Sequence, residues 1–272
     1  MTWTFTLLQP PALRLDLRSL VPQALAGMDV AAVETLPLWQ GRQPLPLAEF
    51  FKVARTDDGA GDSLVFEGDL SRCDRIGWQM ASGRIAVRGC VGDLLGTGLS
   101  GGEITVAGHA GELAGCEMQG GRITVQGNVG DFAAAPLPGS MEGVKGGVLL
   151  VQGRAGARLA DRMRRGLVLV HGGAGDFAAS RLVAGTVAVG GALGAHAGFQ
   201  MRRGTLLCAG GCAIEASPNF IATRHDVGVI WQLLARSLVA YGGAFAGLPS
   251  RRVRRLAGDL ATGGRGEILL PG

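Results

Sequence analysis

The chain has 272 residues, a formal net charge of +4 and 47 glycines. Collagen is excluded because there are only 11 prolines and glycine does not occupy every third position. Disorder is excluded because 47% of the residues are hydrophobic and only 18% are charged. Aromatic residues make up 5% of the chain, so the core must be packed from aliphatic side chains and alanine.

Residues 1–63 are expected to form an N-terminal cap over the first repeat. This segment is rich in proline and contains only short apolar runs. It has no basic region followed by an apolar core, so a secretory signal is not expected. No run of about 18 apolar residues occurs in the sequence, so a membrane span is not expected either. We therefore expect a cytoplasmic protein.

Residues 64–216 follow a 19-residue repeat. The glycine that precedes each short β-branched run recurs every 19 residues, with one longer step of 26 residues, at Gly83, Gly102, Gly121, Gly147, Gly166, Gly185 and Gly204. Apolar residues two and four positions later alternate as in a strand with one buried face. Stacked repeats bury apolar faces that a single repeat cannot bury. The sequence therefore predicts an all-β fold, a single-stranded right-handed parallel β-helix of about seven or eight coils.

The longer step contains seven additional residues around 135–141, which we expect to form a loop at one corner. Residues 217–272 are expected to form a C-terminal helix and tail. Within residues 226–241 apolar side chains recur at helical spacing, so this segment is predicted to be a helix that seals the last coil. The tail is basic and ends in a short predicted strand.

The repeats resemble the C subunit of the formylmethanofuran dehydrogenase family. The resemblance lies in GWQMASGRIAVRGCVGDLLGTGLSGGEITVAGHAGELAGCEMQGGRITVQGNVGDF. Two segments outside the repeats extend it, LPLWQGRQPLPLAEFFKV (residues 36–53) and GDLATGGRGEILL (residues 258–270). The repeats are also distantly similar to the C-terminal domain of the glutamate synthase large subunit.

The resemblance implies a non-catalytic scaffold subunit in one of two settings. One is the bacterial formyltransferase/hydrolase complex, which passes a formyl group through methylofuran and releases formate. There the partners would be amidohydrolase-like and formyltransferase-like subunits in a hetero-oligomer. The other is a tungsten or molybdenum formylmethanofuran dehydrogenase. The chain contains 24 arginines and two lysines, which favours a bacterial source. A glutamate-synthase-like structural module remains the alternative from another class.

No catalytic or metal-binding residues are expected in this chain. Three of the four histidines lie at different positions of the repeat, and the five cysteines form no CxxC pair. The sequence contains no GxSxG, HExxH or Walker A motif. It also lacks an RNP motif or a recognition helix, so nucleic acid is not an expected partner.

Arginine is the stronger functional signal. Residues 1–150 carry 11 basic and 16 acidic side chains, whereas residues 151–272 carry 15 basic and 6 acidic ones. Several basic residues recur at the repeat spacing and predict a cationic ladder. The candidate cofactor-binding residues are Lys145, Arg154, Arg158, Arg162, Arg164, Arg165, Arg202 and Arg203. The resemblance implies a cofactor with a polyglutamate tail, which arginine can bind through bidentate contacts. Docking to acidic residues of a partner subunit is the alternative.

Overall fold

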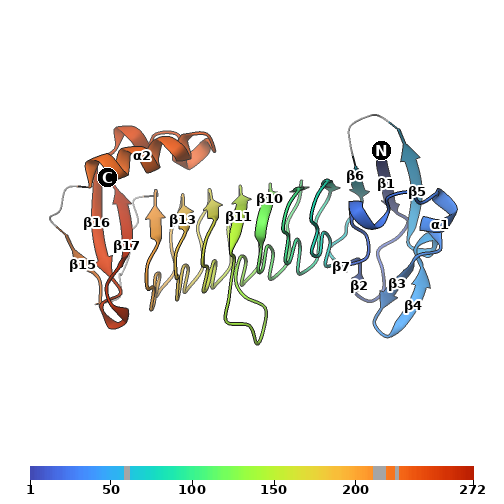
Figure 1. Cartoon of the computed structure of the whole chain (residues 1–272), viewed down its shortest axis with the longest axis horizontal. Coiled ribbons are helices and arrows are strands. Elements are labelled where there is room, and N and C mark those ends of the chain that lie inside the picture. Colours follow the sequence, from blue (N-terminus) through green and yellow to red (C-terminus); the bar gives the residue numbers. More distant parts are fainter. Residues whose placement is uncertain (58–61, 211–218, 224–226) are drawn as a thin grey trace.

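Figure 1 shows a computed structural model of the chain, in which residues 1–57, 62–210, 219–223 and 227–272 are described. The described strands form two sheets, one of 13 strands and one of four. In spatial order the large sheet contains β15 (Ile221–Ala222), β16 (Val253–Gly258), β17 (Gly266–Pro271), β14 (Thr205–Cys208), β13 (Thr186–Val189), β12 (Leu167–Val170), β11 (Gly146–Val151), β10 (Gln119–Val125), β9 (Glu103–Val106), β8 (Arg84–Arg88), β6 (Ser63–Glu67), β1 (Thr2–Leu7) and β5 (Phe51–Thr56).

The small sheet lies at the N-terminal end of the elongated molecule (Figure 1). Its strands in order are β4 (Gln43–Pro46), β3 (Pro37–Gln40), β2 (Leu15–Asp16) and β7 (Cys73–Asp74). The described α-helices are α1 (Val30–Glu34) and α2 (Gly228–Val239). Short 3-10 turns occur at η1 (Pro22–Ala24), η2 (Leu47–Glu49), η3 (Gly243–Phe245), η4 (Leu248–Ser250) and η5 (Leu260–Thr262).

The repeats pair in parallel at the 19-residue spacing. Each of the strands from β8 to β14 comes from one repeat, and residues at equivalent positions face each other, as in Ile85↔Ile104 and Val168↔Val187. The register continues across the longer step, where Ile123 pairs with Leu149. The interior side chains of these strands are almost fully buried. Single-residue parallel bridges connect the turn segments on the other side of the core, at Leu70, Val91, Ala110, Val129, Ala155, Ala174 and Leu193.

The predicted fold class, a single-stranded right-handed parallel β-helix, is wrong. The described strands form a 13-stranded mixed sheet and a four-stranded sheet, and no closed or solenoid sheet is found among them. Within each repeat one segment forms a regular strand, because the glycine-rich remainder folds into turns that make only single bridges. Beyond the repeats, β1 pairs antiparallel with β5, and β16 pairs antiparallel with β15 and β17. The N-terminal segment is therefore part of the large sheet as well as a cover for its end.

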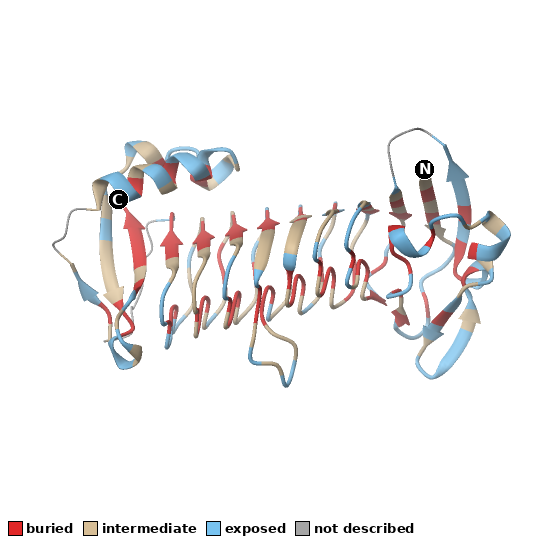
Figure 2. Ribbon diagram, viewed as in Figure 1, coloured by how far each residue is buried: buried red, intermediate tan, exposed pale blue. Residues whose placement is uncertain are grey.

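The C-terminal helix also differs from the prediction. The strand that follows β14 in the sheet is β17, so a strand and not a helix closes this end. Helix α2 instead packs on the outer face of the sheet through Trp231, Ala235 and Leu238. The strand residues beneath this cover are Leu150, Leu169, Ala188 and Leu207. Strands β12, β13 and β14 are consequently buried on both faces, whereas β8 alternates between buried and more exposed residues (Figure 2).

Glycine is required at the closest contacts between repeats. Six residues after each leading glycine is a second glycine whose backbone lies against that of the previous repeat. A Cβ atom on Gly108 would lie 2.7 Å from the backbone carbon and oxygen of Gly89. In this arrangement the Gly108 N–H donates to the Gly89 carbonyl at 2.9 Å. The leading glycines serve a different purpose, because Gly102 has a φ of +81°, a conformation that other residues rarely adopt.

The seven additional residues project as a loop between β10 and β11 (Figure 1). The backbone N–H of Leu137 donates to Glu117 Oε1 at 3.1 Å. At the other end, Arg162 Nη1 donates to the Ser140 carbonyl at 3.2 Å. These contacts hold both ends of the loop against the repeats. The division into residues 1–63, 64–216 and 217–272 remains a prediction, and its second boundary lies outside the described residues.

Candidate functional site

A cationic groove lies along one corner of the repeats, where the chain leads into β11, β12, β13 and β14. Its volume is about 660 Å³. It is lined by Glu142, Lys145, Arg164, Arg165, Val183, Ala184, Arg202 and Arg203. Five of the eight predicted cofactor-binding residues therefore meet in one concave surface, which we call the cationic groove.

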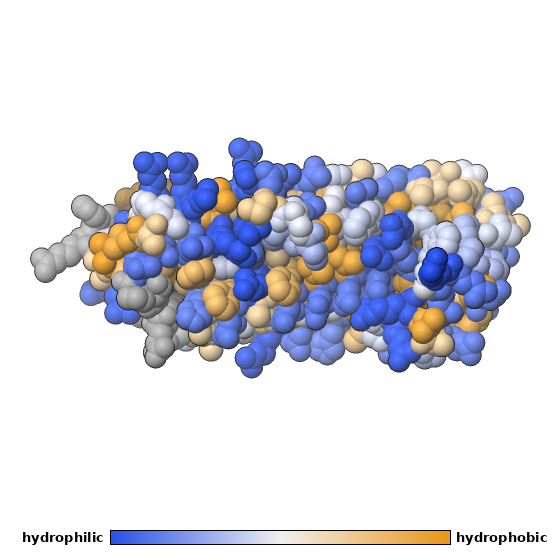
Figure 3. Space-filling model, turned by 90° about the horizontal axis from the view of Figure 1, so that it is seen from below, coloured by the Kyte–Doolittle hydropathy of each residue, from blue (hydrophilic) through white to orange (hydrophobic). Residues whose placement is uncertain are grey.

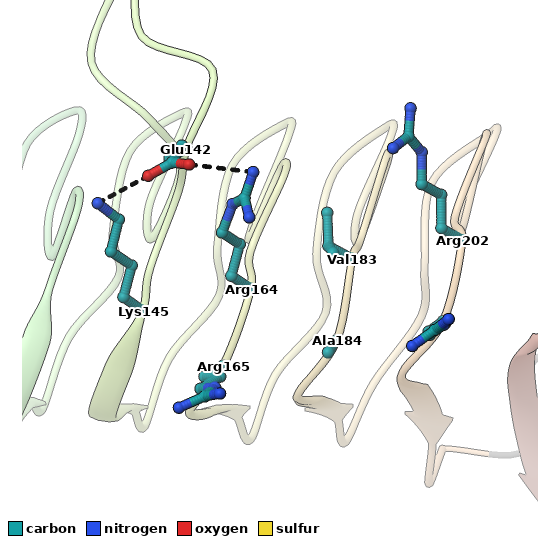
Figure 4. Close-up of a pocket in the computed structure, with 8 residues that line it drawn as sticks. Glu142, Lys145, Arg164, Arg165, Val183, Ala184 and Arg202 are labelled. Carbon is teal, nitrogen blue, oxygen red and sulfur yellow. Dashed lines mark ion pairs between the residues drawn. The ribbon is translucent and has the colours of Figure 1, made fainter.

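The repeat spacing sets the geometry of the cationic groove. Arg164 and Arg202 occupy equivalent positions two repeats apart, so their backbones are separated by about 9.6 Å, or two strand spacings. Val183 and Ala184 take the intervening positions, and their small side chains leave the space between the arginines open (Figure 4). The leading glycine that follows each pair turns the chain into the next strand. This arrangement fixes the backbone of each cation in the hydrogen-bonded ladder.

Glu142 lies at one end of the cationic groove, between Lys145 and Arg164 (Figure 4). Its carboxylate oxygens are 2.8 Å from Lys145 Nζ and 3.0 Å from Arg164 Nη2. The hydrogen bond from Lys145, together with the charges of Arg164 and Lys145, holds the pKa of Glu142 below its usual value. Glu142 is therefore ionised at neutral pH and neutralises part of this end.

The other end of the cationic groove has no counter-charge. In the part of the chain that the structure describes, no ion pair involves Arg165, Arg202 or Arg203. Arg202 and Arg203 are exposed, as is Arg165. With five cations and one carboxylate in its lining, the cationic groove presents a surplus of positive charge. Guanidinium groups in such a hollow can bind carboxylates or phosphates through paired hydrogen bonds. In the view from below, strongly hydrophilic side chains stand out over the C-terminal half of the repeats (Figure 3).

The other three predicted residues lie outside the cationic groove. Arg158 lies between two aromatic rings, with its guanidinium carbon 5.9 Å from the centre of Phe132 and 4.8 Å from that of Phe177. Arg162 holds the loop at residues 135–141 through Ser140 and Met141. Arg154 is exposed at a turn, where its backbone N–H donates to Asn128. The sequence spacing grouped these residues with the others because it does not show around which corner each side chain turns.

Three residues of the cationic groove were missed by the sequence analysis: Glu142, Val183 and Ala184. Glu142 has a signal in the sequence, since it stands 19 residues before Asp161 and three before Lys145. Val183 was visible only as an interruption of the cation series. Its role in keeping the space open becomes apparent once the neighbouring repeats are stacked.

The described residues contain no cluster of three or more histidine, cysteine or acidic side chains suited to a metal ion. His171 packs 4.9 Å from the ring of Phe245, and burial lowers its pKa. Burial raises the pKa of the Cys73 thiol to about 12, so this thiol stays protonated and is a poor nucleophile. His225, the fourth histidine, lies outside the described residues. None of the described helices is long and apolar enough to cross a membrane.

The fold and the cationic groove define the class as a glycine-rich repeat protein with an anion-binding surface at one corner. The whole chain matches a chain in the X-ray crystal structure of the formyltransferase/hydrolase complex (FhcABCD) from Methylorubrum extorquens in complex with methylofuran. The TM-score is 0.91 and the sequence identity 42%, with 99% of each chain covered.

Sequence comparisons give the same family. The C subunit of the formyltransferase/hydrolase complex Fhc of Methylorubrum extorquens is 44% identical over 82 residues, 30% of each chain. The C subunit of molybdenum-containing formylmethanofuran dehydrogenase 1 of Methanosarcina barkeri is 35% identical over 82 residues, 29% of this chain and 27% of the relative. In these two comparisons the matched segments span less than a third of the relatives' length. No protein-family model matches the chain.

The chain belongs to the family of the Fhc C subunit, which resembles the C subunit of formylmethanofuran dehydrogenase. The resemblance predicted from the repeats and the two terminal segments is thus confirmed.

Proposed function

We propose that this chain is the scaffold subunit of a formyltransferase/hydrolase complex that uses a methylofuran-type cofactor to release formate. The observation that carries the proposal is the match over 99% of the chain to a member of such a complex, crystallised with methylofuran. In this proposal the formyl transfer and the hydrolysis take place in other subunits, one formyltransferase-like and one amidohydrolase-like. The complex would work in the cytoplasm, where the free thiols of Cys73, Cys90 and Cys116 remain reduced.

The cationic groove is proposed to hold the polyglutamate tail of the cofactor. Arg165, Arg202 and Arg203 form a cationic end without an internal counter-charge, and the low side chains of Val183 and Ala184 leave room for an extended chain. A tail with many carboxylates would contact several arginines at once. Each contact is weak at an exposed site, but their combination raises the overall affinity because the later contacts form within one bound molecule.

Docking of an acidic partner surface into the cationic groove is the second candidate for these arginines. The exposure of Arg202 and Arg203 favours it, because protruding guanidinium groups can reach a flat surface. The two candidates predict different losses when the charges are reversed. Tail binding predicts an intact complex that has lost its cofactor, whereas docking predicts a complex that has lost a subunit.

The test is charge reversal at Arg164 and Arg202 in the complex purified from its own host. Native mass spectrometry would then measure both the set of subunits present and the mass of bound cofactor. We expect the complex to keep its subunits and to lose cofactor with Arg164→Glu and Arg202→Glu. The matched control is Arg154→Glu, an equal charge change outside the cationic groove, which should keep the cofactor. Normal cofactor occupancy in the double variant would refute the tail proposal.

A further inference from the structure

Glu142 differs from its equivalents in the following repeats. The residue 19 positions later, Asp161, is buried and accepts hydrogen bonds from Arg181 and from the Ser180 hydroxyl. Glu142 follows the projecting loop, and its carboxylate instead turns into the cationic groove. There it occupies Lys145 and Arg164 at 2.8 and 3.0 Å. A carboxylate of the chain itself thus takes the place that a carboxylate of a ligand would take.

This internal carboxylate divides the cationic groove into two ends. At the first end, Lys145 and Arg164 are already paired with Glu142. At the second end, Arg165, Arg202 and Arg203 make no ion pair within the described residues. Because Glu142 is attached to the same chain, its local concentration beside Lys145 is far higher than that of a dissolved small anion. A short ligand therefore competes poorly at the first end and binds at the second.

A longer ligand meets a different situation. The four repeat positions from Lys145 to Arg202 span three strand spacings, about 14 Å. A peptide of two residues reaches only about 7 Å, whereas one of ten residues reaches about 33 Å. Once a long polycarboxylate is held at Arg202 and Arg203, its remaining carboxylates are themselves concentrated beside Lys145. They then compete with Glu142 on equal terms.

We infer that Glu142 is a specificity-determining residue that reserves the Lys145 end of the cationic groove for long polycarboxylates. This inference rests on the proposed binding of a polyglutamate tail in the same groove. Displacement requires only a turn of the Glu142 side chain, because the preceding loop keeps its contacts with Glu117 and Arg162. Small carboxylates in the surroundings then leave this end unoccupied and available to the tail.

The test is calorimetric titration of the purified full-length chain with two probes, diglutamate and decaglutamate. The wild-type chain should bind one diglutamate, at the second end. In Glu142→Gln both ends are open, so the number of diglutamate molecules bound should rise from one to two. Decaglutamate should bind Glu142→Gln about fivefold more tightly with unchanged stoichiometry, since it no longer displaces an exposed ion pair.

The matched control is Glu117→Gln. Glu117 contacts the base of the same loop but does not line the cationic groove, so its variant should bind both probes as the wild type does. A second variant, Arg202→Glu with Arg203→Glu, separates the two proposals. If it abolishes decaglutamate binding while Glu142→Gln still binds one diglutamate, the role of Glu142 is refuted and tail binding stands. If it leaves decaglutamate binding unchanged, tail binding itself is refuted.

Discussion

The guanidinium of Arg181 donates two hydrogen bonds to the carboxylate of Asp161 in the preceding repeat, from Nε at 2.9 Å and from Nη2 at 2.5 Å. The Ser180 hydroxyl donates to the same carboxylate at 2.7 Å. Asp161 is only 3% exposed, so these contacts satisfy a charge that water does not reach. The pair joins neighbouring repeats on the side of the projecting loop.

Loss of this buried carboxylate should destabilise the repeats. Asp161→Asn leaves the Arg181 guanidinium without its counter-charge, and we expect a loss of about 2–3 kcal/mol in the free energy of unfolding. Chemical denaturation measures it. Glu67→Gln is the control, because its partner Arg88 is largely exposed and that pair should contribute less than about 1 kcal/mol. Equal effects of the two variants would contradict the expected difference.

The outer face of the large sheet should contribute unequally along its length. Leu169 is fully buried beneath the α2 segment, so Leu169→Ala should cost about 3 kcal/mol of stability. Thr124 lies in the same line of outward-facing residues on β10, beyond the cover of that segment. Thr124→Ala should therefore change stability by less than about 0.5 kcal/mol. Thermal unfolding of both variants compares them, and a similar loss in each would argue against packing of α2 on this face.

The close backbone contact between repeats should make Gly108 intolerant of a side chain. Its Cβ atom would lie 2.7 Å from the Gly89 backbone, and neither repeat can shift without breaking the ladder. Gly108→Ala should thus cost about 2–3 kcal/mol. Gly139→Ala, in the projecting loop with no atom within 4 Å of the added Cβ, carries only the cost of its positive φ and should lose about 1 kcal/mol. Urea denaturation distinguishes the two.

His171 should make stability depend on pH. Its Nδ1 accepts a hydrogen bond from the Ala244 backbone at 3.3 Å, and burial lowers its pKa. The unfolded chain therefore binds a proton more readily than the folded one, so stability is lost as the pH falls below about 6.5. The unfolding midpoint should be lower at pH 5.5 than at pH 7.5. His171→Asn, which keeps an acceptor but does not titrate, should reduce this difference. Exposed His196→Asn should leave the difference unchanged, and the opposite pattern would exclude His171 as its source.

Sequence analysis predicted the repeat register and most of the cationic groove, because both follow from the periodic spacing of residues. Identical steps of 19 residues bring Arg164 and Arg202 to equivalent positions in whatever sheet the repeats form. Spacing gave no information on which segments become regular strands, and for this reason the predicted fold class was wrong. It also gave no direction for side chains in turns, so Arg158 was grouped with the groove although it packs between Phe132 and Phe177.

The helix was placed incorrectly for a different reason. Its apolar face is a local property of residues 228–239, whereas its position depends on where another apolar surface is left uncovered. Leu150, Leu169 and Leu207 stand where earlier repeats carry Ala86, Thr105 and Thr124. This change from small or polar to large apolar residues was present in the sequence and marks the covered part of the outer face.

The hydrogen-bonded ladder between β12, β13 and β14 has a consequence for any ligand of the cationic groove. The backbones beneath Arg164 and Arg202 are held apart by two strand spacings, and neither can approach the other without rupture of main-chain hydrogen bonds. Charge spacing on the protein is accordingly constant along this corner. Adaptation must come from the bound molecule, so a flexible polyanion can match the arginines, whereas a rigid one must already possess the same charge separation.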